Sequence, residues 1–218
     1  MCIRDSFTIE DGRMVFHEYF KLDAPQTSAE NCVAHNGSLI PIPGRDVMVQ
    51  GWYQGGINVF DWTDPKNPIE IAYHDRGPLN ADQMQMAGSW SVYWYNGVIV
   101  NSEIARGLDI FDLSPSYYLS QNEIDAAKSA TLDYLNAQGQ PHYTWPTTTA
   151  LAGAYADQLE RSGGLGPEAI SAVRAALESG ASGDLNAVAE TLSAGAAGME
   201  HTAKINMLAE TLSDLASM

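Results

Sequence analysis

The chain has 218 residues, 45% of them hydrophobic, which is enough for one large or two small domains with a packed core. Acidic residues outnumber basic ones by 27 to 11, so the formal net charge is −16. Because a surface this negative repels phosphate backbones, we expect no nucleic-acid partner. The apolar runs are short and interrupted, and the sequence therefore predicts no membrane-spanning helix.

The N-terminus differs from the rest of the chain. Residues 1–6, MCIRDS, match neither a signal peptide nor a helix or strand pattern, and we interpret them as a leader that is not native to the protein. The chain would then be a fragment that carries no signal peptide of its own. Cys2 and Cys32 are too few for a disulfide framework or a CxxC metal site. Cys32 lies in an apolar run and is expected to be a small buried residue.

Composition divides the chain near residue 150. All Trp and Phe residues lie before this point, among many residues typical of turns, and this composition predicts strands. The Ala-rich sequence after it predicts helices. Residues 7–119 are expected to form antiparallel strands, and 120–137 a helix that opens with a capping box at Ser120–Glu123 and runs to about Asn136. Residues 138–149 read as a linker. Residues 150–218 are expected to form a small bundle with helices at 150–161, 167–178, 185–193 and 199–216.

One segment of the sequence occurs twice. DVMVQGWYQGGINVFDW, Asp46–Trp62, has a weaker copy in GVIVNSEIARGLDIFDL, Gly97–Leu113, offset by 51 residues. Each copy reads as two short strands around a glycine, Gly56 in the first and Gly107 in the second. The identities fall at turn and core positions, so the repeat indicates a shared scaffold.

The segments around this repeat complete a four-stranded unit. Asn96–Gly97 is a strong signal for a tight hairpin turn, and Asn36–Gly37 repeats that signal in the first unit. Further strands are expected at 14–22 and 69–74. About four short strands in roughly 50 residues is the content of one blade of a β-propeller.

The string INVFDWTDPKNPIEI, Ile57–Ile71, resembles the LVIVD repeat, in which a strand ending in Asp runs into a D-P-x-N-P turn. The resemblance covers residues 14–119, and the second copy departs from it at Leu113–Pro115. It implies β-propeller blades in a secreted or periplasmic bacterial protein of undefined activity. About two blades cannot close a ring of four to eight, so the remaining blades are expected to be missing, unless the chain oligomerises.

Several residues are assigned to the scaffold. Asp61 and Asp112 end equivalent strands and are expected to bond to the backbone of the following turn, with metal binding as the alternative. Asp64 and Pro65 suit the first two positions of a type I turn. We assign a structural repeat role to Gly56, Asp61, Asp64, Pro65, Pro68, Gly107 and Asp112.

A divalent metal could be held by His35, His74 and Glu103, since neighbouring repeats can present such side chains together. No cofactor is established by this pattern, because the histidines show no HxH or HExxH spacing. A hydrogen-bonded structural role for His35 is the alternative. His142 could join the site if the protein were an enzyme.

The two repeats differ most in the loop between their strands, WYQG in the first and EIAR in the second. Because loops carry function more often than strands do, Trp52, Tyr53, Glu103 and Arg106 are candidates to face a ligand. Glu103 and Arg106 could instead pair with each other. The aromatic run at Trp90 and Tyr93–Tyr95 suits either a sugar or peptide surface or the core between blades.

The sequence therefore supports an exported propeller scaffold that binds a protein or small-molecule ligand, with no reaction inferable. The alternative is a metal-dependent propeller enzyme, oxidase-like or hydrolase-like, with a site built from His35, His74 and Glu103.

Overall fold

The computed structural model describes residues 2–139 and 141–218, and the chain forms two compact units. The first comprises Met1–Pro41, Arg45–Leu113 and Thr131–Tyr143, and the second comprises Ile42–Gly44, Ser114–Ala130 and Thr144–Met218. No helix within the described residues is long and apolar enough to cross a membrane. Each unit is taken below on its own.

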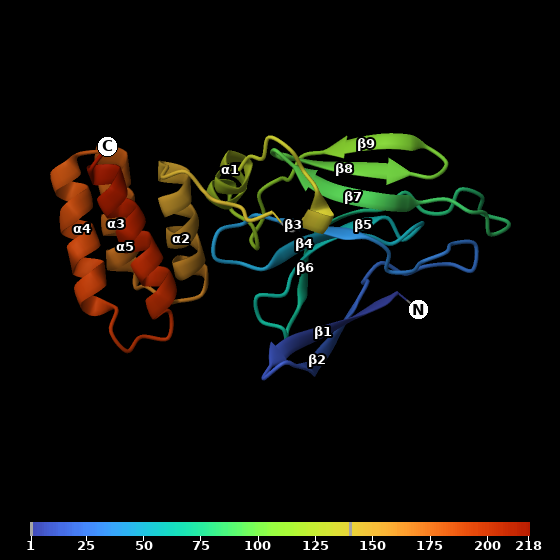
Figure 1. Cartoon of the computed structure of the whole chain (residues 1–218), viewed down its shortest axis with the longest axis horizontal. Coiled ribbons are helices and arrows are strands. Elements are labelled where there is room, and N and C mark those ends of the chain that lie inside the picture. The colour runs from blue at the N-terminus through green and yellow to red at the C-terminus, as the bar shows by residue number, and fades with distance from the viewer. Residues whose placement is uncertain (1, 140) are drawn as a thin grey trace. The chain divides into compact units, whose positions relative to one another are not determined.

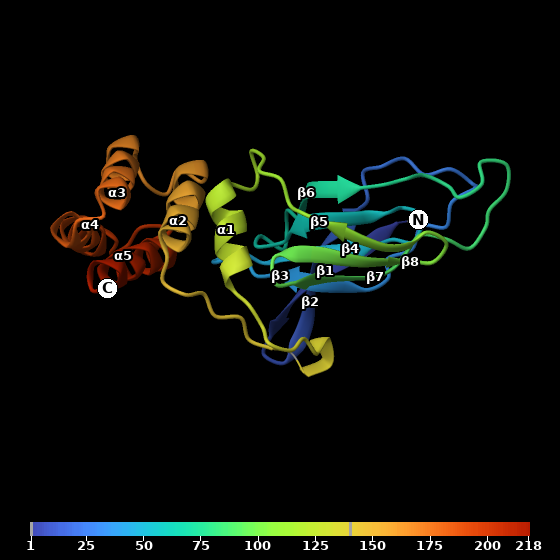
Figure 2. The ribbon, with the colours of Figure 1, turned by 90° about the horizontal axis from the view of Figure 1, so that it is seen from above.

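Within its described residues, the first unit contains three antiparallel sheets (Figure 1). One pairs β1 (Ile3–Glu10) with β2 (Arg13–Lys21). A four-stranded meander follows, and Figure 2 sets its strands side by side in chain order. Its strands are β3 (Gly37–Ile40), β4 (Val47–Gly51), β5 (Ile57–Asp61) and β6 (Ile69–His74). The third sheet has only three strands, β7 (Ser89–Tyr95), β8 (Val98–Glu103) and β9 (Gly107–Phe111). The expected antiparallel strands are thus confirmed.

The central strands β4 and β5 of the four-stranded sheet are buried on both faces. Alternation along β4 places Val47 and Val49 on one face and Met48 on the other, and all three are buried. The Met48 face carries Phe60, whose ring stacks on Phe20 of β2 with centroids 4.7 Å apart. Strands that are apolar on both faces need a packing partner on each side.

The third sheet meets the four-stranded sheet at its first strand, since β7 lies beside β3 and β4. Two side chains at the start of β3 bond to the backbone of β7. Asn36 Oδ1 accepts from the Val92 amide at 2.7 Å, and Ser38 Oγ accepts from the Trp94 amide at 3.2 Å. The prediction of a hairpin turn at Asn36–Gly37 is therefore wrong, because the Asn36 side chain joins two sheets and β3 begins at Gly37.

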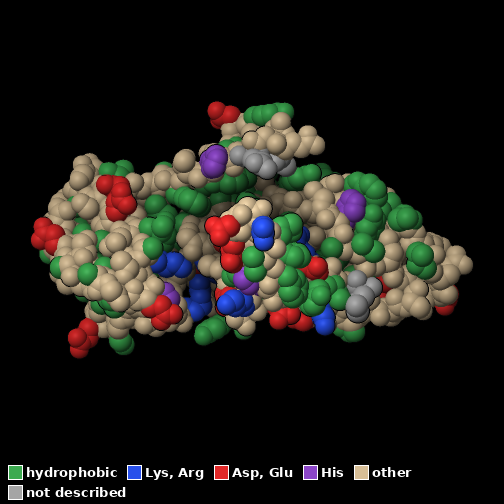
Figure 3. Space-filling model, turned by 60° about the horizontal axis from the view of Figure 1, so that its bottom comes forward, with side chains coloured by type: hydrophobic (Ala, Val, Ile, Leu, Met, Phe, Trp, Pro, Cys, Tyr) green, Lys and Arg blue, Asp and Glu red, His purple; other side chains and the backbone are tan. Residues whose placement is uncertain are grey.

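The third sheet is also apolar on the face turned away from the four-stranded sheet. Val92, Trp94 and Ile99 are buried on its inner face. On its outer face Leu108 is 67% exposed and Ile110 is 63% exposed. The outer face of the β1–β2 hairpin has the same character, with Phe7, Ile9, Met14 and Phe16 exposed, and Figure 3 shows hydrophobic side chains at the surface on this side of the molecule.

The turns follow the predicted chemistry. Asn96 and Gly97 both have positive φ, 45° and 100°, which confirms the tight turn between β7 and β8. Asp61 Oδ1 accepts from the Thr63 amide at 2.8 Å, so its expected bond to the following turn is confirmed. Asp61 also pairs with Arg45 at 2.7 Å.

The D-P-x-N-P turn between β5 and β6 closes as the sequence predicts. The Asn67 amide donates to the Asp64 carbonyl at 3.1 Å, with Pro65 second in the turn. The Asp64 carboxylate accepts from the Lys66 amide at 2.9 Å and from the Asn67 side chain at 2.6 Å. These hydrogen bonds lower the pKa of Asp64. Pro68 follows the turn directly before β6, and Asp112 directly after β9.

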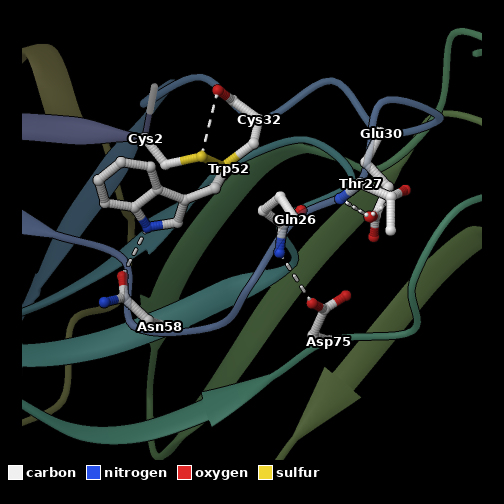
Figure 4. The surroundings of a disulfide bond; sticks show 8 residues. All are labelled: Cys2, Gln26, Thr27, Glu30, Cys32, Trp52, Asn58 and Asp75. Carbon is white, nitrogen blue, oxygen red and sulfur yellow. Dashed lines mark hydrogen bonds between the residues drawn. A yellow bond between two sulfur atoms is a disulfide. The ribbon is translucent and has the colours of Figure 1, made fainter.

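The N-terminal segment departs from expectation. Residues 3–6, which show no strand pattern, belong to β1. Cys2 and Cys32 form a disulfide, drawn in Figure 4, so Cys32 is buried but not a free thiol. The amide of Leu22 also donates to the Cys2 carbonyl at 3.1 Å. Pairing with β2 supplies the strand conformation that the residues themselves do not indicate.

The second unit is helical. Its helices are α1 (Gln121–Ser129), α2 (Thr149–Arg161), α3 (Pro167–Ser179), α4 (Ser182–Gly195) and α5 (Thr202–Ala216). The capping box at Ser120 and Glu123 is confirmed, since each side chain bonds to the backbone of the other residue. The expected extension of α1 to Asn136 is wrong: α1 ends at Ser129, and a short 3₁₀ turn at Ala137–Gly139 follows.

The core of this unit is built from small and aliphatic side chains at helical spacing. Ile170 and Val173 of α3, Leu185 and Leu192 of α4 and Leu208 of α5 are all buried in it. The loop at 42–44 is also part of this unit, and Gln158 of α2 donates to the Pro43 carbonyl at 2.8 Å.

The two repeat glycines give a matched test of the fold. Both have positive φ, +77° at Gly56 and +97° at Gly107. A Cβ at Gly56 would overlap the carbonyl oxygen of His74, whereas one at Gly107 would meet nothing within 4 Å. We expect Gly56→Ala to cost about 3 kcal/mol or more, because strain and overlap add. Gly107→Ala should cost only about 1 to 2 kcal/mol. Chemical denaturation measures both, and equal losses would contradict the register of β5 and β6.

Candidate functional site

The loop of the first repeat begins with a tryptophan that points inward. Trp52 is fully buried beside Phe20, so its expected ligand-facing role is wrong. Its indole Nε1 donates to Asn58 Oδ1 at 2.6 Å, as Figure 4 shows. Asn58 in turn donates to Glu70 Oε2 at 3.2 Å. Burial raises the pKa of Glu70, although the Asn58 hydrogen bond opposes that rise. Trp52 is therefore a core residue, and the hydrogen bonds through Asn58 connect it to Glu70 of β6.

The next residue turns outward. Tyr53 has a φ of +52°, which reverses the chain direction after Trp52. Its ring lies 4.9 Å from the His35 ring and 5.9 Å from the Trp90 ring, measured between centroids. His35 and Trp90 lie 4.7 Å apart, and His35 Nδ1 donates to the Trp90 carbonyl at 2.5 Å. We call these three residues the ring cluster. Trp90 is 48% exposed and His35 is also exposed, so the cluster is open to solvent.

The ring cluster rests on a backbone that side chains hold in place. Tyr53 and Ser89 exchange two backbone hydrogen bonds, of 3.3 and 2.8 Å. Buried Gln54 accepts from the Leu79 amide at 2.8 Å and donates to the Gln85 carbonyl at 2.8 Å, which fixes the long loop before β7. A Cβ at Gly88 would overlap the backbone of Tyr53, so only glycine permits this approach.

The loop of the second repeat is organised by a buried carboxylate. Glu103 accepts from the amides of Gly88, at 2.6 Å, and Ala105, at 2.9 Å, and from the amide of Arg106. The Arg106 guanidinium lies 3.6 Å from Glu103 Oε1. Of the two interpretations of this pair, mutual pairing describes the geometry, and Glu103 acts as an anchor for its own loop and for Gly88.

The two unlike loops converge on one narrow pocket. Tyr53 and Gln54 line it from the first repeat, and Glu103 and Arg106 line it from the second. Other polar groups enter from neighbouring strands and from the segment after β6, namely His74, Arg76, Ser89, Asn101 and Asp109. Arg76 pairs with Asp109 at 2.7 Å. The sequence singled out these loops and the pairing of Glu103 with Arg106, but it did not indicate that the loops converge or that Arg76 pairs with Asp109.

The three residues expected to hold a metal have different surroundings. His35 belongs to the ring cluster, whereas His74 and Glu103 line the pocket. The His74 ring packs at 4.7 Å from that of Phe111. Within residues 2–139 and 141–218, no three His, Cys, Asp or Glu side chains are arranged to hold a metal ion. His142 is exposed and does not line this pocket. A divalent metal at these residues remains a prediction.

The sequence left the role of Trp90 open between a ligand surface and the core between blades. This residue lies in an aromatic run with Tyr93–Tyr95, and simple alternation would place Trp90 on the same face as buried Trp94. The register irregularity between Ser89 and Ser91 instead leaves Trp90 exposed. Trp94 follows the expectation of core between sheets. Trp90 instead joins His35 and Tyr53, which come from segments far away in the chain.

Scans against protein-family models, curated proteins and solved structures found no match to this chain.

The anchoring role of Glu103 predicts unequal effects within its ion pair. Glu103→Ala would leave three backbone amides without their acceptor, so we expect a loss of about 3 kcal/mol in the free energy of unfolding. Arg106→Ala removes only a partly exposed partner and should cost less than about 1 kcal/mol. Urea denaturation of both variants tests this order, and an equal or greater loss in Arg106→Ala would contradict it.

The raised pKa of Glu70 predicts the pH dependence of stability. A carboxyl whose folded pKa exceeds its ordinary value of 4.5 destabilises the fold when ionised, and this penalty fades as the pH falls toward 4.5 and below. Glu70→Gln keeps an acceptor for Asn58 and should stabilise the protein at neutral pH, with the gain disappearing in acid. Thermal melts across pH measure this gain.

Asp64→Asn is the matched control, because the pKa of Asp64 is lowered. Its carboxylate stabilises the fold above its ordinary value of 3.8, and that stabilisation is lost as the pH falls through the lowered value. The variant should therefore be destabilised at neutral pH, again with the difference closing in acid. The same sign in both variants would contradict the assignment.

Proposed function

We propose that this chain is part of an exported, propeller-type repeat protein of the LVIVD kind, and that it serves as a binding scaffold. The ligand contacts the ring cluster of His35, Tyr53 and Trp90. No reaction is assigned to it. The exported location rests on the resemblance of Ile57–Ile71 to the LVIVD repeat.

The layering of the sheets supports the repeat architecture. The central strands of the four-stranded sheet are covered on both faces, and the next sheet along the chain has an apolar outer face with Leu108 and Ile110 exposed. Apolar residues on both faces of a sheet are expected where sheets stack one after another. A further sheet of the same kind, from a longer chain or a second copy, would cover this face.

The exposure of the ring cluster carries the binding proposal. Aromatic rings supply large contact areas at low cost in side-chain entropy, and exposed ones gather at recognition surfaces. Here three rings from three segments lie within 6 Å of one another, and Gln54, Gly88 and Ser89 hold their backbone. A rigid, exposed aromatic surface suits a sugar ring or an apolar side chain of a peptide.

The metal-enzyme alternative has less support from the geometry. His35 is separated from the pocket that His74 and Glu103 line, and the Glu103 carboxylate is engaged by three amides. Elemental analysis of the purified protein discriminates the two functions. Stoichiometric Cu, Zn or Fe that His35→Ala removes would favour the enzyme.

Nuclear magnetic resonance of the indole N–H groups tests the binding proposal. Cello-oligosaccharides, chito-oligosaccharides and a library of short peptides are titrated into the labelled protein, whose five tryptophans give five indole signals. We expect at least one probe to shift the Trp90 signal. Trp90→Ala should then weaken the binding of that probe by about tenfold or more.

Tyr73→Ala is the matched control, since Tyr73 is an exposed aromatic residue of β6 outside the ring cluster. It should leave the affinity unchanged. If no probe moves the Trp90 signal, or if Tyr73→Ala weakens binding as much as Trp90→Ala does, the ring cluster is not the binding surface.

A further inference from the structure

The pocket between the two repeat loops contains an amide whose orientation is fixed. Asn101 is only 2% exposed, and its Nδ2 donates to Asp109 Oδ2 at 3.2 Å. The reversed amide would set two oxygens against each other, so the carboxylate dictates which end faces Asp109. Asn101 Oδ1 therefore faces away from Asp109, and it is buried with no hydrogen-bond partner among the described residues. An acceptor in this state requires a donor.

A second buried atom at this pocket also lacks a partner. His74 Nε2 is shielded from solvent and has no hydrogen bond to any described residue. The ring is held in place by Phe111, with centroids 4.7 Å apart. Phe111 and Asp109 are two residues apart in β9, so their side chains point to the same face of the sheet. The His74 ring packs against Phe111 and the Asn101 amide bonds to Asp109, so both groups lie on this face.

The size and charge of the pocket limit what can bind there. The space between its walls is about 20 Å³, which is room for about one water molecule. Four charged side chains line it, but they form two neutral pairs, Arg76 with Asp109 and Arg106 with Glu103. A cation would face two guanidinium groups, and an anion would face two carboxylates and the Asn101 oxygen. The occupant that fits is therefore small, neutral and both donor and acceptor.

We infer that this pocket is a binding site for a single structural water that joins the two sheets. The water donates to Asn101 Oδ1 and accepts from the Nε2–H of His74, which fixes the imidazole as its Nε2-protonated tautomer. It thereby links β8 to β6 beneath the two repeat loops. This site does not depend on the proposed ligand of the ring cluster.

A high-resolution crystal structure of the unaltered protein tests the site directly. We expect one density peak that refines as water, within about 2.7–3.2 Å of both Asn101 Oδ1 and His74 Nε2. No peak between the two atoms would overturn the inference. A peak that refines as a heavier ion would overturn it as well.

Oxygen-17 relaxation dispersion counts long-lived internal waters in solution and provides the matched comparison. His74→Phe keeps a ring against Phe111 but removes the donor, so it should lose one long-lived water relative to the unaltered protein. His142→Phe, at an exposed position, should lose none. An unchanged count in a folded His74→Phe variant would contradict the inference, and if that variant does not fold, the crystal structure alone decides.

Discussion

The first unit depends on one constraint, which is that β4 and β5, the central strands of its four-stranded sheet, are buried on both faces. Val49 on one face and Trp52 on the other are both inaccessible to solvent. Such a sheet cannot exist alone in water, because burying one face still leaves the other exposed. The β1–β2 hairpin covers the Trp52 face through Phe20, and β7 packs beside β3 and β4. The fold of the four-stranded sheet therefore requires the layers on either side of it.

The same layering creates the candidate site. When two repeats stack, their strand ends come together, and so do the loops in which they differ. Tyr53 and Glu103 meet in this way although 50 positions separate them in the sequence. The apolar strand interiors provide the packing energy, whereas polar groups such as Asn36 and Gln54 form hydrogen bonds between segments at the strand ends. The exposed ring cluster and the narrow polar pocket are two products of that one arrangement.

Local chemistry predicted most of the fold. The two copies of the repeat predicted the strands β4, β5, β8 and β9. Asn96–Gly97 predicted a tight turn, and the capping box of Ser120 and Glu123 predicted the start of α1. The failures involve long-range partners. Asn36–Gly37 has the composition of a turn, but the Asn36 side chain accepts a hydrogen bond from the Val92 amide of another sheet. For the same reason the sequence could place Trp52 and Glu103 in the varying loops but could not show that one is core and the other an anchor.

We propose that the outer face of the third sheet, with Leu108 and Ile110 exposed, is a packing surface. In a solution of this chain alone, the sheet available to cover it belongs to a second copy. Sedimentation velocity should therefore show association that grows with protein concentration. Lysine at both exposed positions, Leu108→Lys with Ile110→Lys, should abolish that association because charges resist burial. A chain that stays monomeric at every concentration, or association that survives both lysines, would contradict the account.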